Sequence, residues 1–400
     1  MKKRFIFIVI IFSLFLISCN KNTEPAPKID SECKLTIVYN LEGVENTVIT
    51  YKYADVVELP ENTNRNFLGW TFDMKEKTIL TEGFMIYKDE TIYALYREVK
   101  NLSFYDLSQI NFETMESSDI DIVKKDKYCL YKDITYKVVN GVKLKLNIYY
   151  PNDGAESHPV LFSYYGGGWI AGSKESTYLN DVYASVLDAG FVVVAPNYRL
   201  CNGSVSYPSP VEDCLDAIRY IVKYKDVLKI DCDMMGSVGY SAGAHLALMA
   251  AFAQDHFAVY EPLKEYTFKL KFVVDYFAPA YYEASEIENI GATGLVFLGS
   301  YLGTTEYSNP ELAKAFPSYY ITENNPLVYI IQGTNDDTVP FTQSIAFFNL
   351  CKENNITCEM LAVEGGSHML NPSYGYSKIN PSLEEVHLSA ANFIKQAAGK

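Results

Sequence analysis

Hydrophobic positions between residues 131 and 400 form short unbroken apolar runs that alternate with longer amphipathic stretches. The first part, ITYKVVNGVKLKLNIYYP, predicts a hairpin that turns at Asn140-Gly141. Continuous apolar strands separated by helices are typical of a mostly parallel sheet covered on both faces, so this region predicts one α/β domain. The strands are PVLFSYY, FVVVAPN, MMGSVGY, KFVVDYFAP, PLVYIIQG and ITCEMLAV, and the helices include Ser209–Tyr224, Ala242–Ala253, Thr342–Glu353 and Ser382–Lys395.

Residues 34–98 show a different pattern, in which β-branched and aromatic residues alternate with polar ones between turn signals such as Glu42-Gly43. This pattern predicts a small β-rich unit. Residues 99–130 are mixed and acidic and are interpreted as a linker, which places the start of the larger domain at residue 131.

The N-terminus carries three basic residues and then an apolar run, Phe5–Leu16, that is interrupted only by a serine. This run is too short to span a bilayer and has the size of a signal-peptide core, so residues 1–18 are predicted to be a signal peptide. The segment LISC resembles the lipobox of bacterial lipoproteins, which implies cleavage before Cys19 and lipidation of its thiol. Residues 19–33 would then be a tether at the cell envelope, facing outside the cytoplasm, with the membrane as partner. An ordinary secretory signal with a coincidental cysteine is the alternative.

Composition narrows the function classes. The 400 residues are 48% hydrophobic and 21% charged, which is typical of a folded protein. The formal net charge of −15 disfavours nucleic acid as a partner. Eight cysteines leave seven if Cys19 is lipidated, and none has CxxC spacing. We therefore expect mostly free thiols and neither a metal site nor a cofactor.

One pentapeptide carries candidate chemistry. Gly239-Tyr240-Ser241-Ala242-Gly243 follows an apolar strand directly and precedes an alanine-rich helix. This is the context of a GxSxG nucleophile elbow, in which a sharp strand-to-helix turn presents the serine hydroxyl at the edge of the sheet. Ser241 is the predicted nucleophile.

A serine hydroxyl needs a base and an acid that orients the base. The segment YIIQGTNDDTVP offers Asp336 and Asp337 after a late strand, and VEGGSHML offers His368 after the last one. Enzymes with a nucleophile elbow of this kind carry their catalytic residues in the chain order serine, acid, histidine, and these residues follow that order. His245 is interpreted as a buried helix residue. The remaining histidines, His158, His256 and His387, are interpreted as surface or structural residues.

Six motifs in order, from Lys143 to His368, make the chain similar to the α/β-hydrolase carboxylesterases, especially the hormone-sensitive-lipase-like and bacterial acetyl or feruloyl esterases. They are LNIYYP, YYGGGWIAGSK, APNYRL, GYSAGAHLA, GTNDDTVP and GGSH. The resemblance implies a serine carboxylesterase that hydrolyses small or carbohydrate-linked acyl esters through an acyl-enzyme, without a cofactor. It places the catalytic acid on Asp336, with Asp337 as the alternative. It also implies that the amides of Gly167, Gly168 and Ala242 form the oxyanion hole.

Two positions depart from that family. Tyr165 stands where it has a histidine before the glycines, and Gln332 stands where it has a histidine before Gly333. Either Tyr165 fills the volume of the histidine and supports the loop, or its hydroxyl adds a donor to the oxyanion hole. Arg199 and Asp213 match family positions and are interpreted as scaffold, with Arg199 paired to an acidic group. The tyrosine-rich segment 281–320 is a candidate cap.

Residues 34–98 resemble a Listeria-Bacteroides repeat, because Phe67-Leu68-Gly69-Trp70 is followed by the closing strand Thr91-Ile92-Tyr93-Ala94-Leu95-Tyr96. The resemblance implies a compact β-grasp-like module, in which Trp70 is interpreted as core and not as a carbohydrate platform. Two further functions stay open from sequence alone: a serine peptidase of related fold, and a non-catalytic binding lipoprotein with a degenerate hydrolase domain.

Overall fold

The computed structural model describes the chain as two compact units, Met1–Val99 and Lys100–Lys400. The predicted signal peptide 1–18, the lipidation residue Cys19 and the turn Glu42-Gly43 lie outside the described residues. Those residues are 32–38, 45–52, 55–60, 67–72, 75, 80, 84–86, 88–96, 121–125, 127–283, 292–322 and 326–400.

The first unit is built from short strands around a small apolar core. Its four-stranded sheet has the order β2-β1-β6-β4, with β1 and β6 parallel, and β3 pairs with β5 separately. Trp70 is 2% exposed and its Nε1 donates to the carbonyl of Pro60 at 2.8 Å, which confirms that it belongs to the core. The strands are β1 (Glu32–Val38), β2 (Thr47–Lys52), β3 (Val56–Val57), β4 (Phe67–Thr71), β5 (Phe84–Met85) and β6 (Glu90–Tyr96).

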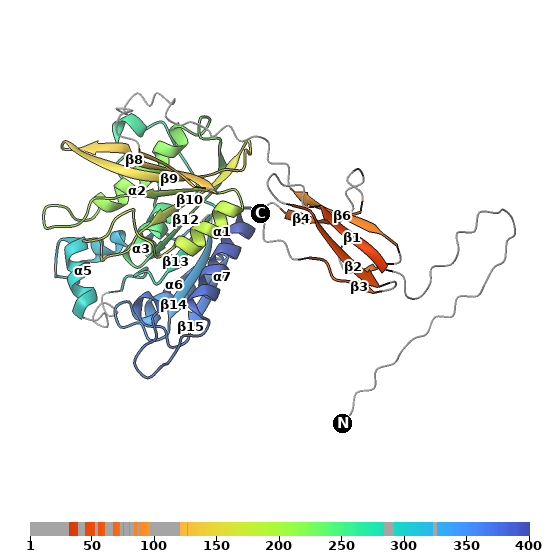
Figure 1. Ribbon diagram of the computed structural model, residues 1–400. Coiled ribbons are helices and arrows are strands. Elements are labelled where there is room, and N and C mark those ends of the chain that lie inside the picture. Colours follow the sequence, from red (N-terminus) through yellow and green to blue (C-terminus); the bar gives the residue numbers. More distant parts are fainter. Residues whose placement is uncertain are drawn as a thin grey trace, which may run out of the picture. The chain divides into compact units, whose positions relative to one another are not determined.

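The second unit is organised around one sheet, which has nine strands in the described residues (Figure 1). Its order is β15-β14-β13-β12-β10-β11-β9-β8-β7; the run from β15 to β11 is parallel and the last three strands are antiparallel. The mostly parallel sheet predicted from the apolar runs is confirmed. The strands are β7 (Asp121–Lys124), β8 (Tyr128–Val139), β9 (Val142–Pro151), β10 (His158–Tyr164), β11 (Val192–Pro196), β12 (Ile230–Tyr240), β13 (Phe272–Tyr276), β14 (Leu327–Gly333) and β15 (Cys358–Val363).

The predicted boundary between linker and domain is wrong at its C-terminal side. Strand β7 begins at Asp121, and the sheet therefore starts ten residues before the expected position 131. An edge strand pairs on one side only and tolerates charged residues, so DIVK lacks the continuous apolar pattern by which the central strands are recognised. Similarly, β1 begins at Glu32, inside the predicted tether 19–33.

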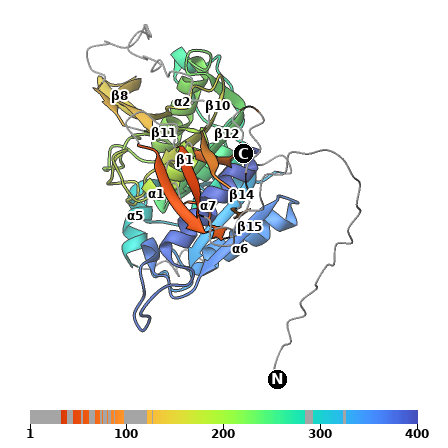
Figure 2. The ribbon, with the colours of Figure 1, turned by 45° about the vertical axis from the view of Figure 1, so that its right-hand side comes forward.

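Helices cover both faces of the sheet. Figures 1 and 2 show α1 and α7 side by side on one face, while α2 and α3 pack together on the other. Helix α7 begins at a capping box, in which Ser382 and Glu385 bind each other's backbone N–H groups. The helices are α1 (Asn180–Asp188), α2 (Ser209–Lys223), α3 (Ala242–Phe252), α5 (Ala292–Leu302), α6 (Phe341–Glu353) and α7 (Leu383–Ala397).

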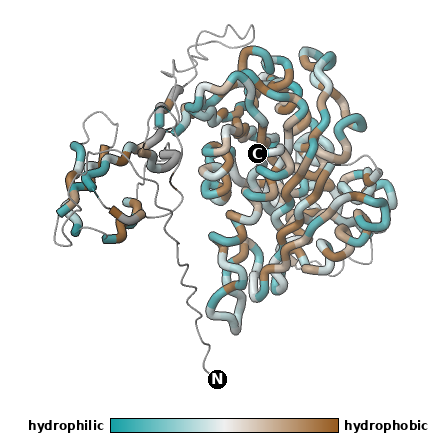
Figure 3. Tube along the Cα trace, turned by 90° about the vertical axis from the view of Figure 1, so that its right-hand side faces the viewer, coloured by the Kyte–Doolittle hydropathy of each residue, from teal (hydrophilic) through white to brown (hydrophobic). Residues whose placement is uncertain are grey.

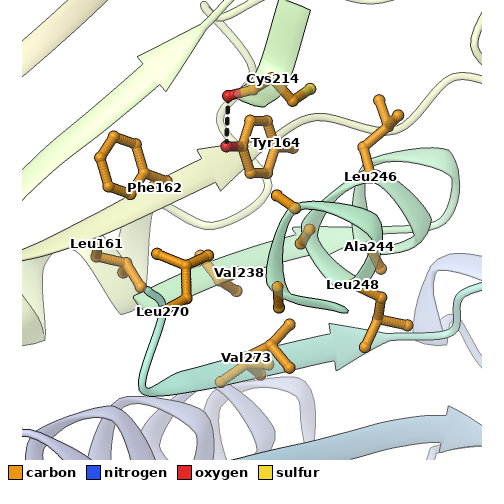
Figure 4. Close-up of a cluster of buried hydrophobic side chains, with 14 of the residues drawn as sticks. Leu161, Phe162, Tyr164, Cys214, Val238, Ala244, Leu246, Leu248, Leu270 and Val273 are labelled. Atoms are coloured by element: carbon orange, nitrogen blue, oxygen red, sulfur yellow. Dashed lines mark hydrogen bonds between the residues drawn. The ribbon is translucent and has the colours of Figure 1, made fainter. Parts of the chain in front are cut away.

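The core of this unit lies between the central strands and α3, every residue of which is buried. Figure 3 shows the hydrophobic residues concentrated along the central strands, with polar residues toward the outside. In Figure 4, Val238 of β12 and Val273 of β13 lie beneath α3, and the hydroxyl of Tyr164 donates to the carbonyl of Cys214 at 3.4 Å. Gly243 in the first turn of α3 lets this helix approach the end of β10 closely.

Two further properties concern the described residues as a whole. None of the helices that the structure describes is both long and apolar enough to cross a bilayer. Seven cysteines in the described part of the chain are free thiols: Cys33, Cys129, Cys201, Cys214, Cys232, Cys351 and Cys358.

Candidate active site

Ser241 lies at the sharp turn between β12 and α3. Its backbone has φ 54° and ψ −126°, a conformation that costs a non-glycine residue about 1–3 kcal/mol. Two hydrogen bonds hold the turn: the N–H of Ser241 donates to the carbonyl of Tyr276 at 2.8 Å, and its carbonyl accepts the N–H of His245 at 3.1 Å. The turn places the hydroxyl at the carboxyl ends of the parallel strands, where sites of open α/β sheets form.

The two glycines of the pentapeptide are required by close approach. A Cβ at Gly239 would overlap the carbonyl of Gly243, and a Cβ at Gly243 would overlap the carbonyls of Tyr164 and Tyr165. Strand and helix can meet this closely only without side chains at both positions. The sequence GYSAG therefore fits the geometry that the elbow demands.

His368 links Ser241 to an aspartate. Its Nε2 lies 3.0 Å from the Oγ of Ser241, and its Nδ1 lies 2.8 Å from Oδ2 of Asp336. The ring of Phe277 packs edge-on against the imidazole, with the centroids 4.9 Å apart. The three residues predicted as nucleophile, acid and base are thus brought together from β12, β14 and β15.

The choice between the two aspartates follows from their surroundings. Asp336 is buried, and its Oδ1 accepts the N–H groups of Thr338 and Val339, each at 2.9 Å. Asp337 is exposed, and among the described residues its carboxylate accepts the hydroxyl of Thr338 alone, at 3.3 Å. Of the two carboxylates, it is Asp336 that the structure places against His368.

The loop that carries His368 is tied to the turn that carries Asp336. The N–H of Asn335 donates to the carbonyl of Gly366 at 2.9 Å, and the N–H of Gly365 donates to Oγ1 of Thr334 at 3.0 Å. These contacts hold acid and base at a fixed separation although the two residues are 32 positions apart in sequence.

The predicted oxyanion donors surround Ser241 unequally. Gly168 and Ala242 line the same pocket as Ser241, whereas Gly167 forms the turn behind it, with its carbonyl accepting the N–H groups of Ile170 and Ala171. Within the described part of the chain, the N–H groups of Gly167, Gly168 and Ala242 have no hydrogen-bond partner. A developing oxyanion beside Ser241 could therefore recruit them.

Tyr165 lies outside that pocket. Its ring stacks on Tyr198 with centroids 4.4 Å apart, and its carbonyl accepts the hydroxyl of Tyr198 at 2.9 Å. The ring also fills the space in front of Gly172, and burial raises the pKa of its hydroxyl. This arrangement fits the interpretation in which Tyr165 fills volume and supports the loop.

The pocket at Ser241 is mainly apolar, and helix α5 forms one wall. Phe297 lies directly on Gly168, where a Cβ would overlap its ring. Tyr301 of the same helix is buried and stacks on Trp169, 4.4 Å between centroids. The lining residues are Gly168, Trp169, Ser241, Ala242, Pro279, Gly294, Phe297, Leu298, Thr338, Val339 and Gln343. The candidate cap 281–320 thus contributes pocket walls, and its buried tyrosines act in packing.

Sequence reasoning missed two supports of this site. Asp275 is buried at the end of β13, where its Oδ1 accepts the N–H of Ala278 at 2.8 Å and so fixes the turn that carries Phe277. Burial raises the pKa of Asp275 to about 7, and its Oδ2 has no partner among the described residues. Gln332 departs from the family pattern, but nothing in the sequence shows its contact with Asp336. For Asp275, the one signal in the sequence is that an acidic residue stands inside the apolar strand FVVDY.

The other histidines lie away from this chemistry. His245 is buried with its Nε2 2.8 Å from the carbonyl of Ala315, and burial lowers its pKa to about 4, so it is neutral at pH 7. His158 and His387 are also buried, whereas His256 packs against Tyr320. Among the residues that the structure describes, no group of three or more His, Cys, Asp or Glu side chains is placed to hold a metal ion.

Comparisons with known proteins agree with this geometry. Residues 146–350 match the BD-FAE family model, a span that contains Ser241 and Asp336, with His368 beyond it. Esterase LipQ of Mycobacterium tuberculosis is 28% identical over 192 residues, covering 47% of this chain and 44% of the relative. Ethyl acetate hydrolase of Pseudomonas putida is 33% identical over 140 residues, covering 34% and 43%. The chain thus spans less than half the length of either relative.

Solved structures share the fold. A truncated carbohydrate esterase from gut microbiota is 20% identical with a TM-score of 0.59, covering 70% of this chain and all of that one. Esterase 2 of Thermogutta terrifontis, with propionate bound, is 24% identical with a TM-score of 0.54, covering 69% and 94%. The predicted α/β-hydrolase fold is confirmed, and the chain belongs to the BD-FAE family of α/β-hydrolase esterases.

Proposed function

We propose that this protein is a serine carboxylesterase that works through an acyl-enzyme. The observation that carries the proposal is the chain of contacts from Ser241 through His368 to Asp336, at 3.0 Å and 2.8 Å, on the edge of an apolar pocket. Family membership supports ester hydrolysis as the reaction class.

The reaction follows from these positions. The Oγ of Ser241 attacks the ester carbonyl carbon while its proton passes to Nε2 of His368. The carbonyl oxygen becomes an anion, which the N–H groups of Gly168 and Ala242 stabilise. The N–H of Gly167 is the third predicted donor. The imidazolium then gives its proton to the departing alcohol, and Asp336 stabilises the charge on the ring meanwhile. A water molecule, activated by the same histidine, releases the acid and restores Ser241.

The pocket supports a short acyl group. Phe297 lies on Gly168 and lines the pocket, so its ring narrows the space next to the oxyanion donors. Phe297→Ala should raise kcat/KM for p-nitrophenyl octanoate relative to acetate by roughly tenfold, because several methylenes gain an apolar site. An unchanged ratio would show that α5 does not limit the acyl chain.

For the alcohol side we propose a glycan. A solved structure titled as a bifunctional GH43-CE of Bacteroides eggerthii is 26% identical with a TM-score of 0.57, covering 67% of this chain and 35% of that one, and the gut-microbiota structure with the same fold is titled as a carbohydrate esterase. Release of acetate from acetylated xylan, compared with hydrolysis of methyl ferulate, tests this assignment. A preference for the ferulate would contradict both the short acyl group and the acetylated glycan.

We also propose that the N-terminus anchors the enzyme to a membrane. Lipidation of Cys19 would anchor the esterase to the envelope of a bacterial cell, and residues 34–98 would be a Listeria-Bacteroides repeat module between anchor and enzyme. Detergent-phase partition of the full chain that is lost in Cys19→Ser supports the anchor, whereas equal partition argues against it.

The central experiment is labelling of the full chain with a fluorophosphonate probe, together with hydrolysis of p-nitrophenyl acetate, butyrate and octanoate. Labelling and hydrolysis should both be absent in Ser241→Ala. If the folded wild-type chain neither reacts with the probe nor hydrolyses any of these esters, the proposed esterase function is wrong and a non-catalytic binding lipoprotein is the better interpretation.

A further inference from the structure

Gln332 occupies a buried position at the end of β14, directly behind the carboxylate of Asp336. Its side chain is fully buried, and its Nε2 lies 2.9 Å from Oδ2 of Asp336 and 3.2 Å from the carbonyl of Val339. On the other side, its Oε1 accepts the hydroxyl of Ser344 on α6 at 2.8 Å. One amide thus connects the strand, the acid-bearing turn and a covering helix.

The neighbours fix the orientation of this amide. The carboxylate of Asp336 and the carbonyl of Val339 can only accept hydrogen bonds, so both require the NH₂ group of Gln332. The amide oxygen must then face Ser344, whose hydroxyl can donate. If the amide were flipped, Oε1 of Gln332 would face two other acceptors, Oδ2 of Asp336 and the carbonyl oxygen of Val339. The orientation with the NH₂ group toward Asp336 is therefore the favourable one.

We propose that Gln332 is a positioning residue for the reaction, which sets the direction and the charge distribution of the Asp336 carboxylate toward His368. The inference rests on the proposed function, in which His368 is the base. Gln332 itself does not reach the substrate, because it is absent from the residues that line the pocket at Ser241.

The contacts of Asp336 explain how this works. Oδ1 is held by two backbone N–H groups, and Oδ2 is shared between Gln332 and His368. All donors other than the histidine are neutral, so the carboxylate keeps its negative charge for the imidazolium that forms during attack. The N–H of Gln332 also competes with Nδ1–H of His368 for the same carboxylate oxygen, which weakens the pull of that oxygen on the Nδ1 proton. An amide performs this task without titrating, whereas the histidine of related esterases could acquire a charge.

Two variants separate this role from packing. Gln332→Met keeps the volume but removes the donor, and kcat should fall about tenfold to a hundredfold at constant KM, with the acidic limb of the kcat/KM profile moved to higher pH. Gln332→Glu keeps the shape but donates only when protonated. Its deficit relative to wild type should therefore be small at low pH and grow to about a hundredfold as the pH rises. Asp336 and His368 are the ionisable groups that contact this cluster, and Asp337 lies in the same turn but is exposed.

Ser237→Ala is the matched control. It removes another fully buried hydrogen bond, from Ser237 to the carbonyl of Ala247 at 3.1 Å, away from Asp336. A similar loss of stability with unchanged kcat is expected. If Gln332→Glu shows the same deficit at every pH, or Gln332→Met behaves like Ser237→Ala, Gln332 is structural only and the inference is overturned.

A second readout does not depend on turnover, so it separates this inference from the proposed function. The low-field proton resonance of Nδ1–H of His368, identified by its loss in Asp336→Asn, should move downfield in Gln332→Met because Oδ2 loses a competing donor. An unchanged resonance overturns the positioning role. Absence of ester hydrolysis and of fluorophosphonate labelling in the wild type, with this shift present, overturns only the proposed function.

Discussion

Two buried carboxylate sites in the hydrolase unit differ in whether cations or neutral donors bind them. On α2, Asp213 and Asp216 are fully buried among cations: Lys137 lies 2.8 Å and 2.7 Å from them, and Arg199 binds both oxygens of Asp213 at 2.7 Å and 2.9 Å. Behind Ser241, Asp336 is held by Gln332 and backbone N–H groups, with His368 as the only group that can become a cation.

The two sites differ in whether a carboxylate is already paired with a cation. Burial alone would lower the pKa of Lys137, but the charges of Asp213 and Asp216 outweigh burial and raise it, so Lys137 stays a cation at neutral pH. Such a cluster holds α2 and β8 together, and its carboxylates are already paired with cations. The carboxylate of Asp336 has no permanent cation, and its charge is therefore available to an imidazolium that appears only in the transition state.

The largest effect should come from removing that available charge. Asp336→Asn should lower kcat by roughly 10³–10⁴-fold, because the imidazolium loses its counter-charge and the ring loses its orientation. Steady-state hydrolysis of p-nitrophenyl acetate measures this, and unfolding midpoints check that the fold is intact. Asp337→Asn is the matched control and should keep wild-type activity; a large loss there would move the acid to Asp337.

In the ion cluster the corresponding change should act on stability and not on catalysis. Lys137→Met leaves two buried carboxylates with one cation fewer, and the free energy of unfolding should fall by about 3 kcal/mol. The exposed pair Lys127–Asp188, at 2.6 Å, supplies the control, since Lys127→Met should cost less than about 1 kcal/mol. Urea unfolding measures both. A selective loss of kcat in Lys137→Met would contradict a purely structural cluster.

Asp275 is intermediate between these sites, because it is buried with neither a cation nor a full set of donors. Its pKa of about 7 in the folded protein lies above the ordinary value of 3.8, so the folded state binds this proton more tightly than the unfolded state. Its contribution to stability is therefore complete below about pH 4 and is lost as the pH rises through about 7. Asp275→Asn should remove this dependence.

The measurement is the unfolding free energy of both proteins between pH 4 and pH 8. Relative to wild type, Asp275→Asn should gain roughly 3 kcal/mol over this interval, since it has no proton to lose. Parallel curves for the two proteins would mean that the carboxyl is already charged in the folded state.

A site can be predicted from sequence when the residues that form it are close together along the chain, and not when they meet only in the folded structure. Ser241 was predictable because strand, glycines and helix are contiguous, and so was the alternation that produces the parallel sheet. The choice between Asp336 and Asp337 depends on which side chain enters the turn, for which the family spacing gave an expectation and the backbone gives the contacts. The roles of Gln332, Asp275 and Phe297 were not predictable, because each depends on a partner that only the folded sheet brings near. Strand β7 was missed because an edge strand need not be apolar.

Tyr165 should give the smallest effect and the sharpest test of the loop beside the oxyanion donors. Its ring packs on Tyr198 and Gly172, outside the pocket of Ser241, so loss of its hydroxyl leaves both contacts in place. Tyr165→Phe should therefore keep kcat within about twofold of wild type, whereas a lost oxyanion donor costs about a hundredfold or more. Tyr198→Phe is the matched control, because it removes the 2.9 Å hydrogen bond to the carbonyl of Tyr165 while preserving the stack. If kcat falls tenfold or more in Tyr165→Phe and not in Tyr198→Phe, the hydroxyl of Tyr165 takes part in the oxyanion hole, and the neutral donors around Ser241 then include a side chain as well as backbone.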